Sequence, residues 1–192
     1  MLNEEKGVLE AKYAFTEDVL QLKDNIGQAV NFQKSIEKKL LKNGELDAYN
    51  KEVQRLIDKE YIAEMTPRDK ERVKDLPTSY ITHHPIYKLS MSTPICLVTN
   101  SNLKNKICGL SPNQCRGKPP NALSSLLEVF LRWRTFEVAL VLDLTKAYQS
   151  IKTPGDLDRN VRRLLWRWGQ TESEWKTYWW QVVTCITCSR TR

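Results

Sequence analysis

Apolar residues recur every three or four positions through the first part of the chain, up to residue 75. In residues 46–61 this stripe is regular and charged residues stand between its members, which is typical of amphipathic helices that bury one face. Asn43-Gly44 precedes the stripe and is a good C-cap and turn for the helix before it. Pro67 is expected to end the last helix. We therefore predict a helical segment over residues 1–75 with a solvated outer face.

Short apolar runs between Pro, Ser, Thr and Asn follow from residue 76 and favour strands. Tyr80-Ile81, residues 85–87 and residues 95–99 are such runs, and residues 89–94 would join the last two in a hairpin. Apolar residues recur at helical spacing in two later segments, and a last strand is expected after the second of them. The two helical segments are residues 123–131 and residues 157–168, and the strand covers residues 178–186.

A near-continuous apolar run at residues 136–142 predicts a buried strand, because it is short and contains β-branched residues. The run ends on Asp143. A buried carboxylate is costly unless it has a partner, a metal ion or access to water. Two interpretations remain open from spacing alone. Asp143 caps the turn after the strand, or it is a rigidly supported ligand of a hard divalent cation.

The segment around Asp143, LDLTKAYQSI at residues 142–151, resembles the first carboxylate motif of reverse transcriptases in BEL/Pao-type retrotransposon Pol polyproteins. Four flanking segments resemble the same family, and together the five occur in the family's order across residues 45–185. They are HHPIYK (83–88), CGLSPNQC (108–115), PPNALSSLLEVFLRWR (119–134) and RRLLWRW (162–168).

The resemblance implies a nucleotidyl transfer that uses two divalent ions, Mg²⁺ or Mn²⁺, as a clamp on the attacking and leaving oxygens. Asp143 matches the aspartate that binds both ions, and the Leu144 carbonyl matches the group that completes one coordination shell. Tyr148 matches the aromatic residue under the nucleotide sugar, although spacing alone would make it a core aromatic. Lys88, in the predicted hairpin, is the candidate triphosphate contact; a solvated lysine is the alternative.

Two departures from the family pattern bear on activity. Cys96 stands where the family carries an arginine, and a thiol cannot supply a guanidinium to a triphosphate. No Tyr-x-Asp-Asp type pair follows Asp143 in the sequence. Because one carboxylate cannot hold two ions in catalytic geometry, we expect a fragment of a reverse transcriptase that is inactive alone. The alternative is a non-catalytic nucleic-acid-binding module or a helical interaction protein derived from a transposon.

The positive charge lies in the part of the chain that carries the motifs. Residues 1–75 hold 14 Lys/Arg against 16 Asp/Glu, residues 76–130 hold 5 against 1, and residues 131–192 hold 11 against 6. A phosphate-binding surface requires such an excess, although ordinary solvated side chains give the same count. The candidate contacts to an RNA or DNA template-primer are Arg116, Lys118, Arg162, Arg163 and Arg167.

Composition adds limits on compartment and partners. The five cysteines are an odd number, and the sequence starts without a signal peptide, so we expect free thiols and no disulfide partner. Cys185 and Cys188 have metal-ligand spacing but lack a second pair, so a zinc site is not expected. No apolar run approaches a membrane span. We expect an intracellular protein, cytoplasmic or nuclear, with no membrane partner.

These observations predict an α+β fold. Residues 1–75 would form a helical segment that leads into the fingers, and residues 76–192 would form a truncated fingers/palm region of a reverse-transcriptase-like domain. The expected partners are the template-primer and a deoxynucleoside triphosphate. Truncation would leave strand edges unpaired and apolar faces uncovered.

Overall fold

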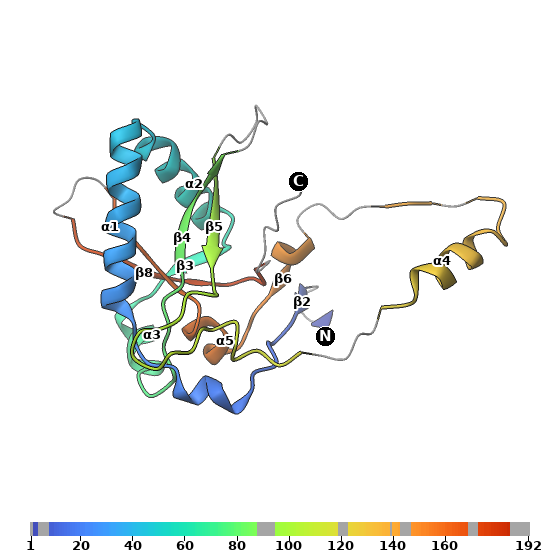
Figure 1. Cartoon of the computed structure of the whole chain (residues 1–192), viewed down its shortest axis with the longest axis horizontal. Helices are drawn as coiled ribbons and strands as arrows, with labels where there is room; N and C mark the ends of the chain where they lie inside the picture. The colour runs from blue at the N-terminus through green and yellow to red at the C-terminus, as the bar shows by residue number, and fades with distance from the viewer. Residues whose placement is uncertain are drawn as a thin grey trace.

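The structure is a computed structural model that describes residues 2–3, 8–87, 95–118, 123–138, 140–142, 147–168 and 173–184. Helices and mostly antiparallel strands are mixed along the chain, which makes the fold α+β. Figure 1 shows a compact body that holds most of the elements and an arm that extends away from it and carries helix α4 (Leu126–Trp133).

Two long helices form one side of the body, as predicted. The first, α1 (Ile26–Asn43), ends at Gly44, whose left-handed φ of 69° lets its N–H reach the carbonyls of Leu40 and Leu41. This confirms the predicted C-cap. The second, α2 (Leu46–Asp58), follows at once and packs against α1. Its buried residues recur at helical spacing, and they are Tyr49, Glu52, Val53 and Leu56.

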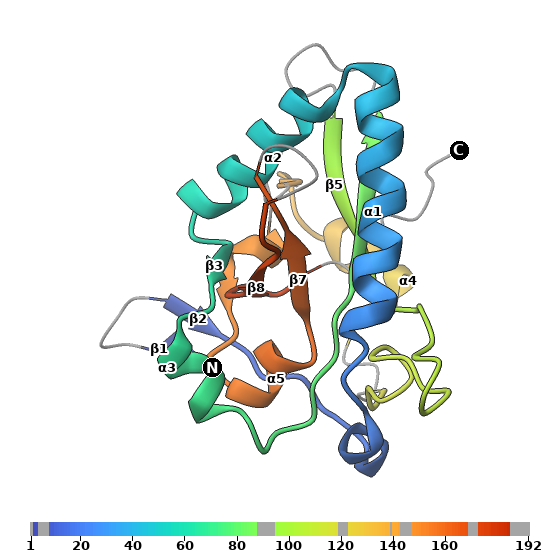
Figure 2. The same ribbon diagram turned by 90° about the vertical axis from the view of Figure 1, so that its left-hand side faces the viewer.

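A three-stranded antiparallel sheet lies beside these helices (Figure 2) and contacts both of them. Its strands are β3 (Ile62–Glu64), β8 (Lys176–Trp180) and β7 (Arg163–Trp166), with β8 in the centre. Every residue of β7 is buried. The predicted helix over residues 157–168 is therefore wrong beyond its first turn, because α5 (Asp156–Asn160) is short and the chain then becomes a strand. A strand that is buried on both faces does not alternate between apolar and polar residues, so the spacing of its apolar residues can match that of a helix.

The predicted hairpin is confirmed. Strands β4 (Thr82–Tyr87) and β5 (Ile95–Asn100) pair antiparallel, with Tyr87 opposite Ile95 and Thr82 opposite Asn100. The hairpin packs against α1 through β4 and against α2 through β5. The predicted connection at residues 89–94 lies outside the described residues.

The first part of the chain is less helical than predicted. Strands β1 (Leu2–Asn3) and β2 (Val8–Glu10) precede a 3₁₀ turn, η1 (Glu17–Gln21), and β2 pairs in parallel with β6 (Ile151–Lys152). Pro67 begins a helix, α3 (Pro67–Arg72), instead of ending one. Proline fits the first helical position, where its missing N–H is not needed. Thr66 and Asp69 form a capping box around it.

The main core draws on residues from both sides of position 75. Leu40, Tyr49 and Val53 of the long helices meet Ile95 of the hairpin and Trp166 of β7. The whole buried cluster comprises Ile36, Leu40, Tyr49, Val53, Leu56, Ile62, Ile81, Ile95, Leu164, Trp166, Tyr178, Trp180 and Val182. The helical segment and the following segment thus stabilise each other through one shared core.

The predicted buried strand at residues 136–142 is wrong for the residues that the structure describes there. None of them lies in a strand, and Val141 and Leu142 are 77% and 86% exposed. Helix α4 does form where helical spacing predicts it, but none of its residues is buried. An apolar run becomes a strand only when neighbours supply hydrogen bonds and cover its faces. In Figure 1 the described part of this arm lies away from the sheets of the body, so no strand is beside it to pair with.

Replacing Leu127 and Phe130 of α4 by serine is expected to change the free energy of unfolding by less than about 1 kcal/mol, because both side chains are already exposed. The same double variant should aggregate less, since it reduces the exposed apolar area of α4. Urea unfolding and light scattering measure the two effects. Leu164→Ser, at a position that is 2% exposed, is the matched control and should cost about 2–5 kcal/mol. Equal losses in the two variants would show that α4 packs against the body.

Candidate functional site

The residues that the sequence assigns to a polymerase site are only partly within the described chain. Asp143, Leu144 and Lys88 lie outside it. Tyr148 lies in a 3₁₀ turn, η2 (Ala147–Ser150), directly before β6. Its ring is 57% exposed, so it is not the core aromatic that spacing alone predicts. An exposed ring on a short turn is accessible to a flat ligand.

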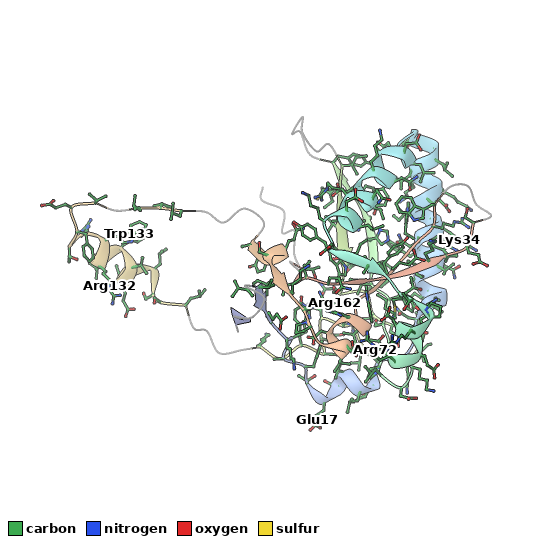
Figure 3. The ribbon with its side chains drawn as sticks, turned by 180° about the vertical axis from the view of Figure 1, so that it is seen from behind. Glu17, Lys34, Arg72, Arg132, Trp133 and Arg162 are labelled. Atoms are coloured by element: carbon green, nitrogen blue, oxygen red, sulfur yellow. The ribbon has the colours of Figure 1, made fainter. Side chains whose placement is uncertain are left out.

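Arg162 lies inside the body, not on a groove (Figure 3). Its side chain is fully buried. Its guanidinium donates to the carbonyls of Asp158 and Val182 at 2.9 and 3.1 Å and to the hydroxyl of Thr153 at 2.9 Å. Burial lowers the pKa of Arg162 to about 10, which leaves it charged at neutral pH. The guanidinium therefore links α5 to the segment after β8 through Asp158 and Val182, and it is not available to a phosphate.

Arg163 and Arg167 are buried as well. Arg163 donates to the side-chain oxygen of Asn160 at 3.0 Å through Nε and to the hydroxyl of Tyr80 at 3.3 Å. Arg167 forms a two-pronged ion pair with Glu37 of α1, in which Nε lies 3.0 Å from Oε1 and Nη2 contacts Oε2. The predicted phosphate-binding or solvated row of Arg162, Arg163 and Arg167 is therefore corrected: all three guanidinium groups bond to the protein itself.

Tyr13 lies between two of the predicted arginines. The Cζ atoms of Arg116 and Arg162 are 4.0 and 4.6 Å from the centre of its ring, and its N–H donates to Asp158 at 2.6 Å. Burial lowers the pKa of Arg116, whose guanidinium nitrogens are buried without a hydrogen-bond partner in the described part of the chain. Arg116 thus stacks on Tyr13. Only Lys118, among the five predicted nucleic-acid contacts, is exposed.

His83 is a buried polar centre that sequence reasoning assigned no role. Its Nε2 donates to the carbonyl of Leu165 at 3.0 Å, and its Nδ1 accepts from the hydroxyl of Tyr49 at 2.7 Å. Gln33 of α1 lies against the same ring. Burial lowers the pKa of His83 to about 4, so the ring is neutral at pH 7. The group joins α1, α2, β4 and β7, and its role is structural.

The predictions about metal ions, thiols and membrane spans can be compared with the described residues only. Among the described residues no three side chains of His, Cys, Asp or Glu are grouped to hold a metal ion. In the described part of the chain no disulfide joins Cys96, Cys108 or Cys115, while Cys185 and Cys188 lie outside it. No helix in the described segments is long and apolar enough to cross a membrane.

Comparison with known proteins gives no family for the chain. No family model matches it, and no curated protein matches it.

Proposed function

We propose that the chain supplies the fingers and the first palm carboxylate of a BEL/Pao-type reverse transcriptase. The observation that carries this proposal is LDLTKAYQSI at residues 142–151 together with four flanking motifs in the family's order. The β4–β5 hairpin supports it, because a hairpin is what the resemblance implies for that segment. The exposed ring of Tyr148 supports it further, since a residue that contacts a nucleotide sugar must be accessible.

In this proposal Asp143 and the Leu144 carbonyl hold Mg²⁺, which would activate the primer hydroxyl and neutralise the triphosphate. Tyr148 excludes a 2′-hydroxyl by contact with the sugar, and Lys88 binds the triphosphate. Because the sequence has no Asp-Asp pair after Asp143, the chain needs further carboxylates for nucleotidyl transfer and does not polymerise alone.

Lys118→Glu is expected to weaken binding to an RNA–DNA hybrid and to reduce the slope of log affinity against log salt by about 1, the effect of losing one phosphate contact. Fluorescence anisotropy of a labelled hybrid at several salt concentrations measures both values. Lys70→Glu is the matched control, since Lys70 is also exposed but lies on α3. No binding by the unaltered chain at low salt would remove the nucleic-acid partner from the proposal.

A primer-extension assay tests the catalytic half. The chain alone with Mg²⁺ should give no product, and a palm fragment that carries the missing Asp-Asp pair should restore extension. Asp143→Asn should abolish the restored activity. Extension that survives this substitution would show that Asp143 is not a metal ligand. Hybrid binding without any restored extension would favour the non-catalytic binding module.

A further inference from the structure

A groove runs along α1 where the helix faces the hairpin. Its volume is about 680 Å³, which is within the ordinary range for small-molecule sites. The apolar floor is Phe32 of α1, with Pro85 and Tyr87 of β4 beside it, while Ile36 and Leu40 lie beneath in the core at 8% and 1% exposure. The opposite wall is strand β4, with Pro85 and His84. The groove is distinct from Tyr148 and from the segment that carries Asp143.

The rim of this groove is positive. Lys39 and Lys42 of α1 line it, both are exposed, and neither makes an ion pair with any described residue. The single acidic residue of α1, Glu37, is buried and bound by Arg167. The solvent-facing charges of the helix are therefore all lysines, and Figure 3 labels one that does not line the groove, Lys34.

The carboxylate of Glu45, at the turn after α1, is hydrogen-bonded. Glu45 accepts hydrogen bonds from the hydroxyl of Tyr87 at 2.5 Å and from the side-chain amide of Asn43 at 3.1 Å. These contacts hold the carboxylate at the turn after α1. Lys39 and Lys42 have no ion-pair partner among the described residues, while Asn43 and His84 offer further N–H donors to the groove.

We propose that this groove binds a small amphipathic anion, with a flat apolar body on Phe32, Pro85 and Tyr87 and an acidic group held by Lys39 and Lys42. The apolar floor supplies affinity by burying the body of the ligand. The two ammonium groups complement a sulfonate, carboxylate or phosphate and fix its direction in the groove. This binding does not depend on the proposed polymerase function, because it uses none of the residues assigned to that function.

The test uses a pair of probes that share an apolar body. 8-Anilinonaphthalene-1-sulfonate carries the anionic group, and N-phenyl-1-naphthylamine lacks it. Lys39→Glu/Lys42→Glu is expected to weaken sulfonate binding to the full chain at least about tenfold, because both charge-assisted contacts are lost and one alone accounts for about that factor. Binding of the neutral probe should change less than twofold. Fluorescence titration measures both dissociation constants.

Lys34→Glu/Lys38→Glu is the matched control, because it makes the same charge change on exposed positions of the same helix that do not line the groove. This variant should change sulfonate affinity less than about threefold, because its side chains make no charge-assisted contact with a ligand in the groove. Equal losses in the two double variants would overturn the proposal and show general attraction to a basic helix. Unchanged sulfonate binding in Lys39→Glu/Lys42→Glu would also overturn it, since the probe would then occupy another apolar surface, such as α4.

Discussion

Glu37→Ala is expected to lower the free energy of unfolding by about 3–5 kcal/mol, the cost of leaving a buried charge without its partner. Glu37 and Arg167 are 4% and 6% exposed, and the carboxylate receives both Nε and Nη2 of the guanidinium. Arg167 also lies 4.6 Å from the centre of the Trp175 ring. Removing the carboxylate takes away the two hydrogen bonds that Glu37 accepts from the buried guanidinium.

Equilibrium unfolding in urea measures this effect, and two further variants separate charge from packing. Glu37→Leu/Arg167→Met removes both charges and keeps apolar volume, so its loss should be smaller than that of Glu37→Ala. Glu71→Ala breaks the exposed pair with Lys74 and should cost less than about 1 kcal/mol. A loss in Glu37→Ala no larger than in Glu71→Ala would show that the pair is solvated.

Acidification from pH 6.5 to pH 4 is expected to remove about 3 kcal/mol of stability through His83 alone. Burial lowers the pKa of His83 from 6.5 to about 4 in the folded chain. The unfolded chain therefore binds a proton at a higher pH than the folded chain. The contribution of neutral His83 to the free energy of unfolding is fully present above pH 6.5 and is lost as the pH falls toward 4. The loss arises because protonation places a second N–H against the Tyr49 hydroxyl in a buried site.

Unfolding free energies measured at several pH values test this prediction by difference. His83→Gln should lower stability at pH 7 but flatten the decline between pH 6.5 and pH 4, since carboxylates titrate equally in both proteins. His84→Gln is the matched control, because His84 is the chain's other histidine and lies next in sequence but is only half-buried. His84→Gln should leave the loss of stability between pH 6.5 and pH 4 unchanged. Parallel curves for the unaltered chain and His83→Gln would contradict a buried neutral ring.

Local chemistry allowed several elements to be predicted, and tertiary context decided the others. Asn43-Gly44 ends α1 because glycine adopts a left-handed φ at little cost, a property that needs no distant partner. The hairpin was predictable from two short apolar runs with polar residues between them. Residues 136–142 have an equally strong local pattern, yet the described ones remain exposed, since a strand also needs a neighbour.

The candidate site shows the same limit. Arginine is usually exposed, so a row at positions 162, 163 and 167 resembles a phosphate-binding face. The structure instead buries all three against acceptors from distant segments, including Glu37 and Tyr80. Nothing in the local sequence identifies those acceptors. The α1 groove was missed for a related reason, because its two walls are far apart in sequence.

The position of β8 at the centre of its sheet has a consequence for synthesis. Helices α1 and α2 and strand β3 leave the ribosome long before β8, which pairs with both β3 and β7 and begins only at Lys176. The apolar stripes of α1 and α2 therefore emerge long before Trp166 and Tyr178 arrive to cover them. During translation the nascent chain displays the surface that chaperones bind, and the body closes only near the end of the described chain.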